Sequence, residues 1–134
     1  MKTISFFSYK GGAGRSTLAF NIIPILARDH FHPTAAHPMI IVDTDVDSCG
    51  MAYLVGAEKQ ITETNCIQHL LGNPFVTRRY PSIQEHPFIS QLIPVGKAFG
   101  CEDDRAILLM PAMAREPISS SSSGIFSHFL PCLI

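Results

Sequence analysis

The chain has 134 residues, of which 46% are hydrophobic and 16% charged, and its formal net charge is −1 at pH 7. This length predicts a single domain with enough chain to bury a core. The near-neutral charge excludes binding to nucleic acid that is driven by net charge, although it leaves room for a local basic patch.

The cysteine spacing and the N-terminus indicate a reducing compartment. Cys49, Cys66, Cys101 and Cys132 form no C-x-x-C pair, which argues against a zinc site and against a thioredoxin-type redox site. The residues before the first glycines are too few for the apolar core of a signal peptide. No apolar run reaches the ~18 residues of a membrane-spanning helix. We therefore expect a cytoplasmic protein with free thiols and no membrane span.

The N-terminal part of the chain predicts a strand, a glycine-rich turn and a helix in succession. Thr3–Ser8 is short and rich in Phe and Ile, which is typical of a buried strand. The run up to Ala27 predicts a helix that begins near Ser16 and turns an apolar stripe towards a sheet. Pro24 costs such a helix about 3 kcal/mol unless the helix kinks there. The residues of the predicted stripe are Leu18, Ile22, Ile25 and Leu26, widened by Phe20 and Ile23.

The stretch YKGGAGRST (Tyr9–Thr17), which we call the glycine loop, has the composition of a phosphate-binding turn. Its three glycines permit backbone conformations that other residues resist, and they keep side chains out of the concavity. The helix that follows adds free N–H groups and the positive end of its dipole. Arg15 adds a positive charge, and Ser16 adds a hydroxyl at the place of a magnesium ligand. The alternative is a glycine-rich turn that holds no ligand.

The connection Arg28–Pro38 is rich in turn residues and carries His30, His32 and His37. An H-x-H pair can bind a metal when it lies on a strand, but this pair lies between a helix end and a proline. Apart from Asp29, no carboxylate or cysteine nearby completes a ligand set. We interpret the three histidines as helix-terminal and loop residues, with metal binding as the alternative.

Met39–Val42 predicts a second buried strand, and it leads directly into the acidic run Asp43–Asp47. Carboxylates at the carboxyl end of a strand stand at the ligand-binding edge of an α/β sheet. The alternative is an ordinary turn, because Asp favours turns through local hydrogen bonds. A calcium-binding EF-hand loop does not fit, since Ser48 replaces its glycine and Leu54 its final glutamate.

These two motifs together resemble a known family. Lys10–Gly14 matches the start of the deviant Walker A motif K-G-G-x-G-K-[ST], with Arg15 in place of its second lysine, which is similar to a K-G-G-x-G-R variant. The strict P-loop pattern G-x-x-x-x-G-K-[ST] fails at Tyr9 and Arg15. The run IIVDTDVDSCGMAYLVG resembles the family's D-x-D motif, about thirty residues later, the length of one βαβ unit. Residues 3–56 thus resemble the ParA/MinD-type ATPases, the CobQ/CobB/MinD/ParA nucleotide-binding domain.

The resemblance implies an α/β fold of the P-loop NTPase type, a Rossmann-like three-layer sandwich with a mainly parallel sheet. It implies ATP and Mg²⁺ as cofactors, with Ser16 as a magnesium ligand and Asp43 supporting the metal's water shell. Asp45 would orient the attacking water, and Lys10 would reach the phosphates of the other subunit in an ATP-bound homodimer. A protein partner or DNA is compatible with the same resemblance. The implied ATP-binding residues are Lys10, Gly11, Gly12, Ala13, Gly14, Arg15, Ser16 and Thr17.

The central part of the chain predicts one further helix, Thr62–Leu71, capped by Thr62 or Thr64 and ended by Gly72 and Pro74. We expect Ile67, Leu70 and Leu71 to face inward. The small basic cluster Thr77–Tyr80 is interpreted as a solvated loop, with contact to nucleic acid as the alternative.

Two short apolar runs follow, Phe88–Val95 and Ala106–Met110. The second resembles the family's strand that ends in isoleucine-proline-alanine. The family's Walker B strand, an apolar run that ends in Asp, should come next, but no such run occurs after Met110. We therefore expect a partial nucleotide-binding domain over 1–117, incomplete on its C-terminal side, and a Ser-rich irregular tail over 118–134. The predicted strand at Ile4–Phe7 would then lack a sheet partner, which predicts low stability or dependence on a partner chain.

The predicted function is that of an ATP-binding, dimerising switch with Mg-ATP hydrolysis, an ATPase of the deviant Walker type if it is active. Three alternatives stay open: a regulatory module that binds nucleotide without hydrolysis, a phosphotransferase built on the same loop, and an inactive fragment with a truncated or frame-shifted end. Arg15 favours nucleotide binding over hydrolysis, since the planar guanidinium of arginine replaces the compact ammonium group of the family's lysine.

Overall fold

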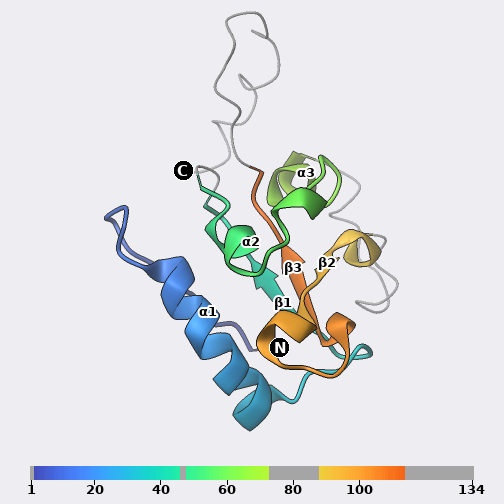
Figure 1. The fold of residues 1–134 in the computed structure, drawn as a ribbon. Helices are drawn as coiled ribbons and strands as arrows, with labels where there is room; N and C mark the ends of the chain where they lie inside the picture. The colour runs from blue at the N-terminus through green and yellow to red at the C-terminus, as the bar shows by residue number, and fades with distance from the viewer. Residues whose placement is uncertain (1, 46–47, 73–87, 114–134) are drawn as a thin grey trace, which may run out of the picture.

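The computed structural model describes residues 2–45, 48–72 and 88–113. Within these ranges, two or more helical elements separate each strand from the next (Figure 1). In order they are α1 (Arg15–Leu26), the π-helix η1 (Ala27–Phe31), β1 (Met39–Val42), α2 (Gly50–Leu54), the 3₁₀-helix η2 (Glu58–Gln60), α3 (Ile67–Gly72), the 3₁₀-helix η4 (Ile89–Gln91), β2 (Ile93–Pro94), the 3₁₀-helices η5 (Gly96–Phe99) and η6 (Asp104–Ala106), and β3 (Ile107–Met110).

The three described strands form one mixed sheet in the order β1-β3-β2. β1 runs parallel to β3, from Met39 opposite Ile107 to Val42 opposite Met110, and β2 runs antiparallel to β3. β3 therefore occupies the centre and its residues are buried throughout. A small sheet of one parallel and one antiparallel pair does not decide the predicted P-loop sandwich, which stays a prediction.

The central strand β3 sends alternate side chains into two separate apolar clusters, one on each face of the sheet. Ile107 and Leu109 pack with residues of α1, α2 and η5. Leu108 and Met110 pack with residues of α3 and of the segment that leads into β2. Because side chains alternate along a strand, these four consecutive apolar residues require cover on both faces. The helices supply that cover (Figure 1).

Helix α1 confirms the predicted helix, and Ile23 and Phe20 of the predicted stripe pack in the core, but other residues of the stripe do not. Ala19, Ile23 and Ala27 are buried, whereas Leu18 and Ile25 are about half exposed, at 52% and 48%. The two alanines let the helix axis come close to its neighbours, so spacing at i, i+4 and i+8 selects a face of small residues. The prediction that Leu18 and Ile25 face the sheet was wrong.

Pro24 lies inside α1, and the helix continues past it. The N–H of Ala27 donates to the carbonyls of both Ile23 and Pro24. From Ala27 the chain continues as the π-helix η1, which ends at His32 with a left-handed φ of 45°. The loss of one helical hydrogen bond at Pro24 is thus tolerated within a regular helix.

Thr3–Ser8 forms no strand, so that prediction was wrong. None of the described strands pairs with it, and Ile4 and Phe7 are exposed, the latter at 76%. Phe6 alone of this segment packs against the cluster beneath α1. An apolar run becomes a strand only where a neighbour accepts and donates its backbone hydrogen bonds.

Helix α3 is shorter than predicted, because the chain from Thr62 to Cys66 forms a turn instead. Asn65 is buried: its side chain accepts from the N–H of Thr62 and donates to the carbonyl of Gln60. The N–H of Ile67 donates to the carbonyl of Pro111, which attaches the start of α3 to the chain after β3. Ile67 is buried as predicted, but Leu71 is 71% exposed, so its inward assignment was wrong.

The predicted strand runs near the C-terminus contain β2 and β3. Pro74, the basic cluster Thr77–Tyr80 and the Ser-rich tail lie outside the described residues. Among the helices that the structure describes, none is long and apolar enough to cross a membrane. The same residues hold no group of three or more His, Cys, Asp or Glu side chains arranged for a metal ion.

Candidate functional site

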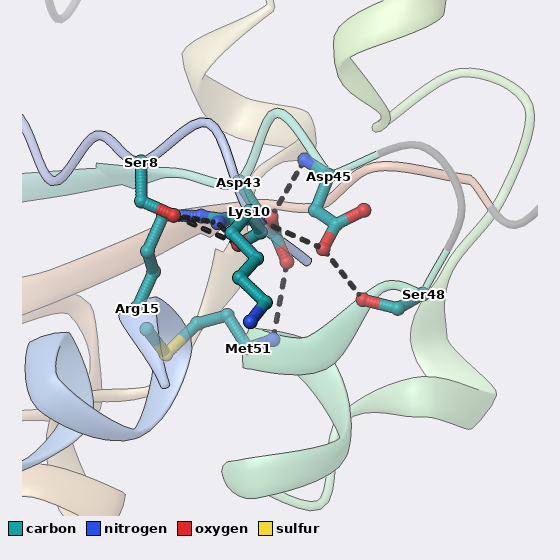
Figure 2. A network of polar contacts seen from close by, with 7 residues as sticks. All are labelled: Ser8, Lys10, Arg15, Asp43, Asp45, Ser48 and Met51. Atoms are coloured by element: carbon teal, nitrogen blue, oxygen red, sulfur yellow. Dashed lines mark hydrogen bonds and ion pairs between the residues drawn. The ribbon is translucent and has the colours of Figure 1, made fainter. Parts of the chain in front are cut away.

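The start of α1 and the carboxyl end of β1 bring the glycine loop beside the two aspartates. Asp43 directly follows β1, and its N–H donates to the carbonyl of Met110 in β3 at 2.9 Å, which extends the parallel pairing by one residue. Arg15 begins α1, and its Nη2 lies 4.0 Å from Oδ2 of Asp45. Figure 2 shows these side chains together with Ser8, Lys10, Ser48 and Met51.

The backbone of the glycine loop leaves a row of N–H groups open. Gly12 and Gly14 have φ values of 71° and 75°, which a residue with a side chain adopts only with strain. The first hydrogen bond of α1 runs from the N–H of Leu18 to the carbonyl of Gly14, and no side chain caps the helix. The N–H groups of 11–17 donate to no residue that the structure describes. They are therefore available to an anion.

Arg15 folds back onto the glycine loop. Its Nη1 donates to Oγ of Ser8 at 2.7 Å and to the carbonyl of Lys10 at 3.1 Å. The Ser8 hydroxyl in turn donates to the same Lys10 carbonyl at 2.9 Å. The arginine thus closes the loop internally in addition to supplying the positive charge that the sequence predicts.

Asp43 is buried, with 8% of its surface exposed, and both its oxygens accept backbone hydrogen bonds. Oδ1 accepts from the N–H of Asp45 at 3.0 Å, and Oδ2 from the N–H of Met51 at 3.1 Å. Met51 lies in the first turn of α2, so this carboxylate stabilises the start of that helix. Asp43 therefore has a structural role: the bond from Asp45 is the local turn hydrogen bond that the sequence offered as the alternative, and the bond from Met51 had no sequence signal.

Asp45 is partly exposed and bridges two elements. Its Oδ2 accepts from Oγ of Ser48 at 2.8 Å and faces Arg15. Cys49 follows in a left-handed conformation (φ 48°), and its Sγ donates to the carbonyl of Ala112. The turn after β1 is thereby attached both to the glycine loop and to the chain after β3.

Ser16, near the start of α1, lies close to Gly50 at the start of α2. A Cβ atom added at Gly50 would lie 2.9 Å from Oγ of Ser16 and 3.3 Å from its Cβ. Glycine at position 50 therefore permits this approach of the two helix starts. The Ser16 hydroxyl forms no hydrogen bond with any described residue, so it has a free lone pair and a free proton.

The predicted site residues gather at one end of α1. Arg15 and Ser16 are partly buried, and the rest of the predicted ATP-binding set is exposed. Lys10 takes part in the polar network only through its carbonyl, which accepts from Ser8 and Arg15. Its ammonium group forms no ion pair with the carboxylates that the structure describes. Thr17 accepts through its carbonyl from Asn21. The exposed members of the set are Lys10, Gly11, Gly12, Ala13, Gly14 and Thr17.

Three residues of the network were not identified from the sequence: Ser8, Ser48 and Met51. Ser48 follows Asp45 by three residues, a spacing at which a hydroxyl reaches a turn carboxylate. Ser8 directly precedes the loop. Met51 participates through its backbone, which no sequence motif encodes.

Comparison with known proteins gives no match: no family model, no curated protein and no solved structure matches this chain.

Proposed function

We propose that this chain binds the phosphate groups of ATP at the glycine loop, as a nucleotide-dependent switch of the ParA/MinD type. The observation that carries the proposal is the row of open N–H groups over 11–17, at the positive end of a helix of 12 residues. The left-handed φ values of Gly12 and Gly14 support it, because such conformations let successive N–H groups turn towards one anion. The basic side chains of Lys10 and Arg15 add positive charge at the same place.

The residues fit Mg²⁺ only in part. The Ser16 hydroxyl is open to a metal ligand role, as Ser or Thr in a phosphate-binding loop is. Asp43 accepts one hydrogen bond at each oxygen and keeps a further lone pair on each, so it can accept from metal-bound water. Bound Mg²⁺ would neutralise phosphate charge. Ser16 and Asp43 are the residues that would hold it and its water shell.

The first experiment measures how affinity depends on phosphate number. Isothermal titration calorimetry with ATP, ADP, AMP and adenosine, each with Mg²⁺, should show affinity falling in that order. A phosphate site at the glycine loop predicts this ranking, because the base contributes equally to all four. Adenosine that binds as tightly as ATP would contradict the proposal.

A matched pair of glycine substitutions tests where the phosphates bind. Gly12 and Gly56 have nearly equal φ values, 71° and 69°, and a Cβ at either would meet no atom within 4 Å. Gly12→Ala and Gly56→Ala should therefore cost similar stability, roughly 1–2 kcal/mol each. Only Gly12→Ala should lower the ATP affinity, by about tenfold, since it alone changes the backbone conformation that orients the N–H groups of the glycine loop.

Hydrolysis is the part of the proposal that has a specific alternative. Asp45, the residue predicted to orient the attacking water, already accepts from the Ser48 hydroxyl and faces Arg15. This favours, as the second candidate, a module that binds nucleotide without turning it over. Phosphate release under saturating Mg-ATP separates the two. A rate that Asp45→Ala lowers supports the ATPase, whereas equal background rates in both proteins support the binding module.

Dimerisation belongs to the same proposal. The ammonium group of Lys10 is exposed and unpaired within the described part of the chain, as a residue that reaches another subunit requires. Light scattering after size-exclusion chromatography, with and without a non-hydrolysable ATP analogue, tests it. We expect a dimer with the analogue that Lys10→Ala abolishes. A chain that stays monomeric with saturating analogue would remove the dimer from the proposal, and binding to DNA or to a protein partner would then need its own evidence.

A further inference from the structure

Ser8 is the residue around which the Arg15 contacts are arranged. Its Oγ accepts from Nη1 of Arg15 at 2.7 Å and donates to the carbonyl of Lys10 at 2.9 Å, while the same Nη1 donates to that carbonyl at 3.1 Å. We call this arrangement of Ser8, Arg15 and the Lys10 carbonyl the clasp (Figure 2). The other N–H groups of the guanidinium donate to no residue that the structure describes.

The two contacts of the guanidinium differ in strength. The bond to Ser8 is short and charge-assisted, which is the stronger class of hydrogen bond. The pair with Asp45 spans 4.0 Å, and both side chains are about one third exposed, at 32% and 33%. Such a pair is screened by solvent and contributes little. Arg15 can therefore leave Asp45 while it stays on Ser8.

We propose that Ser8 is a positioning residue, whose hydroxyl holds Arg15 where the guanidinium exchanges the Asp45 carboxylate for an oxygen of a phosphate group bound at the glycine loop. This inference rests on the proposed function of the loop. Arg15 is the first residue of α1, so its side chain starts beside the open N–H groups. The free N–H groups of the guanidinium suit a phosphate, because an arginine fork can contact two of its oxygens.

The exchange makes Asp45 a competitor of the ligand. Without phosphate, the carboxylate of Asp45 partly neutralises Arg15. With phosphate, Asp45 loses that contact and keeps the Ser48 hydroxyl at 2.8 Å. The state of the loop is thereby transmitted to the turn that carries Asp45, through one side chain and without movement of the helices.

The first measurement needs no ligand. In ¹⁵N NMR spectra of the full chain, the Arg15 guanidinium should show slow rotation and slow hydrogen exchange. Ser8→Ala should make both fast, and Ser8→Thr should restore them, because threonine keeps the hydroxyl. Ser5→Ala is the matched control, an exposed serine of the same segment without a hydrogen bond to any described residue.

The second measurement is ATP affinity of the same variants by calorimetry. Ser8→Ala should lower the ATP affinity by about tenfold, as expected when a hydrogen bond to a charged group is lost. Ser8→Thr should restore the affinity. Asp45→Asn should raise the ATP affinity by about threefold, because the carboxylate that competes with phosphate for Arg15 is removed. In an Arg15→Ala background, Asp45→Asn should change nothing. A double-mutant cycle of this kind isolates the contact between the two side chains.

The outcomes separate this inference from the function on which it rests. If the wild type binds ATP and Ser8→Ala binds it with the same affinity, the exchange is overturned and the phosphate site stands. The same holds if Asp45→Asn raises the ATP affinity in the Arg15→Ala background as well. A guanidinium that rotates as fast in the wild type as in Ser8→Ala overturns the clasp. If the NMR signs of the clasp are present and no protein binds ATP, the proposed function fails and the exchange with it.

Discussion

The carboxylate of Asp43 accepts a hydrogen bond from the N–H of Met51 at 3.1 Å and thereby attaches the start of α2 to the end of β1. The same carboxylate accepts from the N–H of Asp45. Since Asp43 is buried, loss of its carboxylate takes the acceptor away from both of these backbone donors.

We predict that Asp43→Asn destabilises the fold by about 1–3 kcal/mol, because its amide would turn a donor towards a donor at one of the two N–H groups. Chemical denaturation measures this. Asp29→Asn is the control: Asp29 is an exposed residue whose pKa is lowered by the hydrogen bond from Arg28, and its loss should leave stability nearly unchanged. Equal effects of the two substitutions would contradict the buried role of Asp43.

Gly50→Ala should push the starts of α1 and α2 apart. The new Cβ would lie 2.9 Å from Oγ of Ser16, closer than real Cβ contacts, and 3.3 Å from its Cβ, which is tighter than most. The expected cost is about 1–3 kcal/mol, as for other overpacked contacts. Thermal melts should show that Ser16→Gly in the same chain recovers most of this loss. Gly11→Ala, where a Cβ meets nothing within 4 Å, should not destabilise.

Leu109→Ala should cost about 2–5 kcal/mol, since Leu109 is fully buried in the central strand. Leu71→Ala makes the same chemical change at a side chain that is 71% exposed, and it should stay within about 0.5 kcal/mol of the wild type. Urea denaturation of both variants compares them directly. A large effect at Leu71 would instead indicate that this side chain is buried by a partner.

The Cys101 thiol is expected to react slowly with alkylating reagents. Burial raises the pKa of its side chain, so less thiolate forms at pH 8 than in an unfolded chain. Alkylation followed by mass spectrometry of the Cys101 peptide should be slower for the folded than for the denatured protein. The neutral thiol also adds stability below the ordinary cysteine pKa, and this contribution disappears as the pH rises through the folded-state value. Cys101→Ala should lack that pH dependence.

The sequence alone determined the local features. The glycine loop, the helix after it and the strand Met39–Val42 are encoded by glycine, by apolar runs and by β-branched residues, which act over a few neighbours. The position of Asp43 at the carboxyl end of a strand was likewise predictable. These predictions depend on short-range backbone preferences, and the structure agrees with them.

The tertiary structure decided everything that depends on a distant partner. Thr3–Ser8 is not a strand, because no described strand pairs with it. Ala19, Ile23 and Ala27 are buried while Leu18 is half exposed, because the elements against which α1 packs decide which of its faces is covered. Arg15 meets Asp45 only because α1 packs against α2 and the sheet, which places the end of β1 beside the start of α1. Contacts between residues far apart in sequence have no local signature, so only the folded chain defines them.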